Sequence, residues 1–208
     1  MKRLFLLSVL VSTLALAAAG CGDNSSPRSA SQAASSNGVQ RADQGDTYLT
    51  LGDSVAAGVG ASDRDNGYAD VLFKALQEDD PTLTRHVNLA IPGETSASLI
   101  RRQLDHAVDE LRTGDVRLAT FAIGANDLLR LLRDCASQID SPECKSKANA
   151  AIDELRKNID ESLDTLLAVE SGTRFVVVGY YNPLGSVLPD TAQYATQLNQ
   201  ALRDAADE

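Results

Sequence analysis

Three short segments of this chain carry residue types that together could perform acyl transfer. The first is Gly-Asp-Ser at residues 52–54, which follows an apolar run and precedes the small residues 56–58. The other two are Gly-Glu-Thr at 93–95 and Gly-Ala-Asn-Asp at 124–127. A serine hydroxyl can attack a carbonyl carbon, and glycine N–H groups or an asparagine amide can bind the oxyanion that forms. Small residues beside the serine would leave room for a substrate.

Apolar runs and amphipathic segments alternate along the chain from residue 47 onward. The predicted strands are 47–52, 86–91, 116–123 and 174–180, and the predicted helices are 66–77, 97–112, 128–133, a long helix over 152–166, and 191–206. This alternation predicts an α/β fold, a three-layer α/β/α sandwich with a parallel sheet. Ligands bind beyond the carboxyl ends of such strands, so we expect Ser54, Gly93 and Asn126 to converge there.

Ordinary structural roles remain open for the same residues. A serine after a strand can cap the next helix, and the Asn126-Asp127 pair can cap a helix in the same way. Capping does not prevent Asn126 from also acting as a donor. We expect Asp53 to order the turn that holds Ser54.

Taken together, the three segments resemble the SGNH, or GDSL, hydrolase family of serine esterases and lipases. The resemblance covers roughly Thr47 to the end and implies a flavodoxin-like fold. It implies that Ser54 is the nucleophile and forms an acyl-enzyme with a small-molecule carboxylic ester. It also implies an oxyanion hole made of the N–H groups of Ser54 and Gly93 and the side-chain amide of Asn126, with no cofactor and no metal. No G-x-S-x-G surrounds Ser54, and the chain has no P-loop lysine.

The catalytic base of that family has no counterpart in this sequence. The family places a histidine in an Asp-x-x-His block near the carboxyl end, whereas the two histidines here are His86 and His106. We expect His86 at the start of its strand, at the wrong end of the sheet, and His106 in solvent. We therefore expect a chain truncated before the last strand, that block and the last helix, and nearly inactive. The alternative is a non-catalytic surface lipoprotein that binds an acyl or sugar ligand in a degenerate SGNH pocket.

The amino terminus is typical of an exported protein. Residues 1–20 form a predicted signal peptide, with a positive start, an apolar core over 4–16 and small residues before Cys21. The arrangement resembles the bacterial lipoprotein signal and implies lipidation of Cys21, while plain secretion remains open. Residues 21–46 are rich in Ser, Ala, Asn and Gly, which predicts a flexible linker. Residues 47–208 form the predicted hydrolase domain, held at the membrane on its extracytoplasmic side.

Composition and cysteines narrow the class further. The chain of 208 residues is long enough for one such domain, and its net charge of −10 argues against nucleic acid as a partner. Aromatic residues make up 4%, which disfavours broad sugar-stacking platforms. Cys135 and Cys144 flank a polar loop, and in an exported chain they favour a disulfide over a metal site. We expect a monomer.

Overall fold

The chain divides into two units, residues 1–40 and residues 41–208. The structure is a computed structural model and describes residues 46–135, 138–169, 171–182 and 191–207. The predicted signal peptide, the predicted lipidation site Cys21 and nearly all of the predicted linker lie outside the described residues. They stay predictions.

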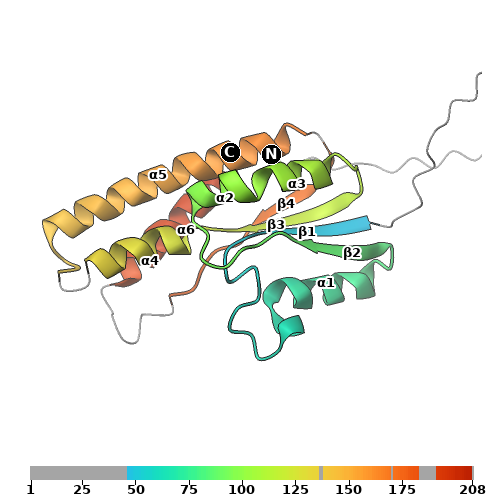
Figure 1. Cartoon of the computed structure of the whole chain (residues 1–208), viewed down its shortest axis with the longest axis horizontal. Helices are drawn as coiled ribbons and strands as arrows, with labels where there is room; N and C mark the ends of the chain where they lie inside the picture. The colour runs from blue at the N-terminus through green and yellow to red at the C-terminus, as the bar shows by residue number, and fades with distance from the viewer. Residues whose placement is uncertain (1–45, 136–137, 170, 183–190, 208) are drawn as a thin grey trace, which may run out of the picture. The chain divides into compact units, whose positions relative to one another are not determined.

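A parallel sheet forms the centre of the second unit (Figure 1). Its strands are β1 (Asp46–Gly52), β2 (Leu83–Asn88), β3 (Val116–Ala122) and β4 (Arg174–Val177), in the order β2-β1-β3-β4. All three pairings are parallel, with Leu49 of β1 opposite Val87 of β2 and Ala119 of β3. The order is that of the flavodoxin-like sheets, in which strand order reverses beside β1. The predicted α/β sandwich is therefore confirmed, and the carboxyl ends of β1 and β3 flank the point of reversal.

Helices cover both faces of the sheet (Figure 1). They are η1 (Arg64–Asn66), α1 (Tyr68–Asp79), α2 (Ser96–Arg102), α3 (Leu104–Leu111), α4 (Ala125–Asp134), α5 (Pro142–Leu167) and α6 (Ala192–Asp207). α1 packs on one face, over a small cluster around Tyr48, Ala69 and Leu83. The other face carries the larger core, in which Leu49 and Leu51 of β1 meet residues of α2 through α6. None of the helices described here is long and apolar enough to cross a membrane.

Most predicted elements are present, but β2 lies three residues earlier than predicted. It begins at Leu83, whose side chain is buried under α1, and not at His86. The contact with β1 nevertheless continues past the end of β2, because Leu89 N–H donates to Thr50 and Ile91 N–H donates to Gly52. The prediction that His86 starts the strand is therefore wrong, and His86 lies within β2.

The helix predicted over 97–112 is two helices, α2 and α3, which meet at Gln103. Gln103 is the C-cap of α2, with φ −117° and ψ −32°, and its buried side chain reaches β1. α4 begins at Ala125, three residues before the predicted start, so Asn126 lies in its first turn. β4 ends at Val177, three residues before its predicted end at Tyr180.

The predicted disulfide between Cys135 and Cys144 is present. It joins the end of α4 to the first turn of α5, with the two Cα atoms 5.9 Å apart. Closing a loop of this size stabilises a fold by about 2–3 kcal/mol in the chain-entropy picture. The helix that carries Asn126 is thus fixed covalently at its far end.

Candidate active site

β1 ends in a turn that requires glycine at residue 52. Gly52 has a φ of +142°, and a Cβ atom there would collide with the carbonyl oxygen of Ala122 on β3. The buried side chain of Gln103 binds the same residue twice. Gly52 N–H donates to Gln103 Oε1 at 2.9 Å, and Gln103 Nε2 donates to the Gly52 carbonyl at 2.8 Å. These contacts fix the backbone that leads into Ser54.

Asp53 stabilises the turn, as expected from the sequence. It is fully buried, its Oδ1 accepts the N–H of Val55 at 2.9 Å, and its Oδ2 accepts the hydroxyl of Tyr180 at 2.8 Å. Burial raises the pKa of Asp53, while these two hydrogen bonds act in the opposite direction. Burial and the neighbouring Asp53 raise the pKa of Tyr180, which keeps its hydroxyl a neutral donor. Both Asp53 oxygens are thus occupied, and the carboxylate is not free to act on a substrate.

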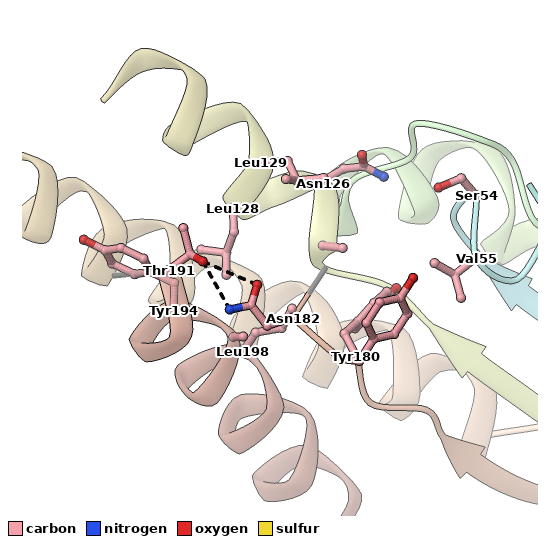
Figure 2. A pocket seen from close by; sticks show the side chains of 13 residues that line it. Ser54, Val55, Asn126, Leu128, Leu129, Tyr180, Asn182, Thr191, Tyr194 and Leu198 are labelled. Carbon is pink, nitrogen blue, oxygen red and sulfur yellow. Dashed lines mark hydrogen bonds between the residues drawn. The ribbon is translucent and has the colours of Figure 1, made fainter. Parts of the chain in front are cut away.

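Ser54 is half-buried and its side chain lines a pocket (Figure 2). No described residue hydrogen-bonds its hydroxyl, and its N–H donates to none of them. The residues that follow, 55–60, form turns and not a helix. The capping interpretation of Ser54 is therefore wrong, and both its N–H and its hydroxyl are left for other partners.

Gly93 lies in an exposed turn between β2 and α2. Its φ of +82° favours glycine, and a Cβ atom there would meet no atom within 4 Å. Glycine is thus needed for the backbone conformation and not for packing against the protein. The N–H of Gly93 has no acceptor in the described part of the chain. The next residue is anchored, because the buried Glu94 carboxylate pairs with Arg102 at 2.8 Å.

Asn126 is joined to the segment that contains Gly93. Its Nδ2 donates to the carbonyl oxygen of Glu94 at 2.8 Å. A side-chain amide carries two N–H donors, so one remains for a ligand. The N-cap position of α4 is held by Gly124, with no side-chain capping bond. Capping by Asn126 or Asp127 is therefore also wrong.

A buried network braces the start of α4 against α2 and α5. Asp127 accepts the N–H of Ser96 at 3.0 Å and the Ser96 hydroxyl at 2.7 Å, and Asn158 Nδ2 donates to the same hydroxyl at 2.9 Å. Burial raises the pKa of Asp127, and the bonds from Ser96 oppose that shift. The network fixes the helix ends next to Gly93 and Asn126 relative to each other.

The pocket beside Ser54 has a volume of about 240 Å³. Figure 2 shows the Ser54 hydroxyl and the Asn126 amide facing each other across it, with Leu128, Tyr194 and Leu198 grouped farther from Ser54. The lining residues are Ser54, Val55, Ala125, Asn126, Leu128, Leu129, Tyr180, Tyr181, Asn182, Thr191, Tyr194, Ala195 and Leu198. The structure thus brings Ser54 and Asn126 to one cavity, while Gly93 is linked to it through Glu94 and does not line it.

Neither histidine lines this pocket. The His86 ring packs against Tyr48 and Phe73, at centroid distances of 4.8 Å and 5.3 Å. It also bonds Thr50 and Asp70. His106 is exposed on α3, as expected. Within the described ranges, no group of three or more His, Cys, Asp or Glu side chains is placed to hold a metal ion.

Three positions that shape this site were not predicted from the sequence. Tyr180 was predicted as the last residue of a strand, yet it bonds Asp53 across 127 positions of sequence. Gln103 was predicted within a helix, and nothing in its local sequence indicated that its side chain is buried and bonds β1. Nothing local in the sequence indicated the role of Asn158, which is a polar residue on the buried side of α5.

Comparison with known proteins points to one family. The GDSL-like Lipase/Acylhydrolase family matches residues 50–208. No curated protein matches the chain. Similar solved structures include a lipase, Lip_vut3, from a goat rumen metagenome, with 19% identity, a TM-score of 0.66, and coverage of 76% of this chain and 75% of the lipase.

Two further structures share the fold at a similar level. Phospholipase A1 from Streptomyces albidoflavus NA297 has 20% identity and a TM-score of 0.56, with 78% of this chain and 76% of that chain covered. The esterase EstA from Pseudoalteromonas sp. has 18% identity and a TM-score of 0.51, with 78% and 72% covered. The family match covers the end of β1, all of β2, β3 and β4, and the three segments that contain Ser54, Gly93 and Asn126. This chain belongs to the GDSL-like lipase/acylhydrolase family.

Proposed function

We propose that the site is that of a serine hydrolase for carboxylic esters, with an acyl-enzyme on Ser54. The observation that carries the proposal is a set of unpaired donors. The N–H groups of Ser54 and Gly93 have no acceptor in the described part of the chain, and Asn126 has one donor to spare. Buried or half-buried N–H groups are usually paired, so the spare donors of Ser54 and Asn126, which line one cavity, suit an oxyanion. The Gly93 N–H lies in the exposed turn that Asn126 contacts through Glu94.

The proposed reaction follows from these groups. Ser54 Oγ bonds to the ester carbonyl carbon, its proton passes to a base, and the carbonyl oxygen takes the negative charge next to the donors. The carbon–oxygen bond to the alcohol then breaks, and the alcohol leaves with a proton. Water later cleaves the acyl-serine ester and releases the acid. Since neither His86 nor His106 lines the pocket, the base in this chain is water or a solute, and turnover is slow.

Chemical rescue tests the proposal on the chain as it is. A fluorophosphonate probe loses fluoride when a serine oxygen bonds to its phosphorus, and added imidazole can accept the serine proton. We expect slow labelling at Ser54, faster labelling with imidazole, and none in Ser54→Ala. Ser62→Ala, which removes an exposed serine outside the pocket, is the matched control and should label like wild type. Mass spectrometry of the labelled peptide identifies the residue, and equal labelling of Ser54→Ala would refute the proposal.

The second candidate is a non-catalytic lipoprotein that binds an acyl or sugar ligand. It is favoured by one observation, the absence of any histidine from the residues that line the pocket. The two functions differ in the rescue experiment. A binder keeps its ligand affinity but shows no imidazole-dependent labelling of Ser54.

We also propose that the protein is a lipid-anchored, extracytoplasmic monomer. Support comes from the signal-like residues 1–20, the position of Cys21 and the Cys135–Cys144 disulfide, which suits an oxidising compartment. Radiolabelled palmitate supplied to expressing bacteria should enter the wild-type protein and not Cys21→Ser. Equal incorporation in both would contradict the anchor.

A further inference from the structure

The end of α2 contacts two loops at the carboxyl ends of the strands. The Gln103 side chain binds the backbone of Gly52, in the turn after β1. Arg102, the residue before it, reaches back to the loop between β2 and α2, residues 91–95, where its guanidinium lies 2.8 Å from Glu94 Oε1. Two consecutive side chains thus anchor the turn after β1 and the loop after β2 to the same point of the fold.

Glu94 is the buried member of this ion pair. Its side chain is 0% exposed, whereas the side chain of Arg102 is 59% exposed. No described residue donates a hydrogen bond to Glu94 Oε2, although that atom is buried. A buried ion pair is often no more stabilising than well-packed apolar residues of similar volume, because both charges lose contacts with water. Stability alone therefore does not account for a carboxylate at this position.

The backbone of Glu94 is linked to both of the spare donors outside β1. Its carbonyl oxygen accepts one N–H of Asn126 Nδ2 at 2.8 Å, and Figure 2 shows this amide facing the Ser54 hydroxyl across the pocket. Glu94 also follows Gly93 directly, and its own N–H donates to the Ile91 carbonyl at 3.2 Å, which closes the turn around Gly93. A shift of Glu94 would therefore move the donors of Gly93 and Asn126 together.

We propose that Glu94 and Arg102 are positioning residues for the oxyanion donors, an assignment that rests on the proposed function. Neither side chain lines the pocket, so both act through other residues. The ion pair holds the loop after β2 where the Gly93 N–H and the Asn126 amide can meet the oxyanion formed at Ser54. Such donors must be in place before the charge develops, so a small displacement of the loop lowers the rate while the fold persists.

Variants of Arg102 test the charge. Arg102→Met removes the charge and keeps an unbranched chain, and it should slow imidazole-assisted fluorophosphonate labelling of Ser54 on the order of 10- to 100-fold. Arg102→Lys keeps a positive charge and should recover most of the rate, because one guanidinium nitrogen makes the contact with Glu94. The matched control is Arg101→Met, at an adjacent exposed arginine outside this ion pair, which should label like wild type. A wild-type rate in folded Arg102→Met, or no recovery in Arg102→Lys, would overturn the proposal.

Glu94→Leu separates positioning from stability. Arg102→Met leaves a buried carboxylate without its counter-ion, which destabilises a fold, whereas Glu94→Leu removes the buried charge and leaves Arg102 in solvent. We expect Glu94→Leu to unfold at a temperature no lower than wild type and yet to label Ser54 on the order of 10- to 100-fold more slowly. It also replaces Arg102→Met if that variant does not fold. A wild-type labelling rate in Glu94→Leu would make the pair structural only and overturn the proposal.

The Asn126 side-chain amide gives a readout that needs no reaction. Its two protons appear as a pair of signals in a proton–nitrogen correlation spectrum, and Asn126→Ala identifies the pair by its loss. The proton bonded to the Glu94 carbonyl should exchange slowly with water in wild type and in Arg101→Met. It should exchange faster in Arg102→Met and in Glu94→Leu, because the loop is released. Unchanged exchange in both of these variants would overturn the proposal.

The positioning pair and the proposed function fail in different ways. Faster exchange of the Asn126 amide in Arg102→Met, with no labelling of Ser54 in any protein, would keep the positioning of that amide and remove the hydrolase. Labelling that requires Ser54 but is the same in wild type, Arg102→Met and Glu94→Leu would keep the hydrolase and remove the positioning pair.

Discussion

Two regions of this molecule each contain some of the groups that a serine hydrolase uses. Under α1, His86 Nε2 lies 3.0 Å from the Thr50 hydroxyl, and His86 Nδ1 lies 3.4 Å from an Asp70 carboxylate oxygen. This hydroxyl–imidazole–carboxylate order is that of a catalytic triad. At the carboxyl end of the same strand β1, Ser54 lines a pocket and its N–H has no acceptor among the described residues, but no imidazole lines that pocket.

The difference between the two regions is access. Thr50 is fully buried, and the His86 ring is enclosed by aromatic rings, so no carbonyl can approach that hydroxyl. Burial lowers the pKa of His86, against the influence of Asp70, and this favours the neutral ring. The region around Ser54 has the opposite character, with a half-buried hydroxyl and N–H groups that no described residue has taken. A hydroxyl, an imidazole and a carboxylate in the order of a triad therefore do not form an active site by themselves. A cavity and unpaired N–H donors must also lie beside the hydroxyl.

The largest expected effect comes from removing a donor at the Ser54 region. Asn126→Ala takes away the side-chain N–H that would bind the oxyanion, and losing one such donor costs about 10²- to 10³-fold in rate in comparable sites. We expect imidazole-assisted fluorophosphonate labelling of Ser54 to slow by that factor. Asn66→Ala, at an exposed asparagine remote from the pocket, is the control and should label like wild type. An unchanged rate in a folded Asn126→Ala protein would remove Asn126 from the proposed oxyanion hole.

The next effect tests whether the turn before Ser54 depends on a distant side chain. Gln103→Ala leaves the Gly52 N–H unpaired in the interior, while the Gly52 carbonyl keeps its bond from Ile91. We expect a loss of about 2 kcal/mol in the free energy of unfolding and slower labelling of Ser54, because the turn loosens. Denaturant titration and labelling rates measure the two effects. Gln200→Ala on the exposed side of α6 should change neither. A stability loss without any change in labelling would make Gln103 purely structural.

His86→Phe tests the other region, where a smaller and pH-dependent effect is expected. Phenylalanine keeps the ring stacking but loses the bonds to Thr50 and Asp70, which costs about 1–2 kcal/mol near neutral pH. Burial lowers the pKa of His86 in the folded state, so the unfolded chain takes up the proton first as pH falls below about 6.5. Wild type therefore loses stability in that window, and its advantage over His86→Phe should narrow.

Denaturant titrations at pH 7.5 and 5.5 measure this gap. His106→Phe, on the exposed face of α3, is the control and should follow wild type at both pH values. A gap that widens on acidification would mean that the bond to Asp70 outweighs burial. Slower labelling of Ser54 in His86→Phe would be a different result, since it would connect the two regions.

The bounds of β1 and β3, which end in a continuous buried run, were predictable from sequence, whereas the bounds of β2 and β4 were misjudged by three residues. β1 and β3 were predicted to within one residue because apolar runs end at glycine-containing turns. β2 was misplaced because most of its side chains are only half-buried or exposed, which leaves no clear alternation. The junction between α2 and α3 was missed, and the Gln103 side chain at that junction bonds a residue 51 positions away. Local periodicity carries no information about such a bond.

The candidate site also has one part that was predictable from sequence and one part that was not. The short segments around Ser54, Gly93 and Asn126 could be found from residue types and spacing, since each follows a strand. The pocket could not be found, because it is formed by α4, α6 and the residues after β4, which meet only in the folded chain. Tyr180 is the clearest case. Its bond to Asp53 depends on Asn199 of α6, which holds the Tyr180 backbone through bonds of 2.7 Å and 2.6 Å.

Thr50→Val gives the smallest effect and the most direct test of the comparison. Valine has nearly the shape of threonine, so packing in β1 is kept while the hydroxyl that bonds His86 is lost. We expect a loss of at most about 1 kcal/mol in unfolding free energy and no change in the labelling rate of Ser54. A double-mutant cycle with His86→Phe should give a coupling of at least about 0.5 kcal/mol, because the two side chains are in direct contact. If Thr50→Val folds normally yet slows labelling as much as Asn126→Ala does, then the buried hydroxyl acts on Ser54 and the two regions are one site.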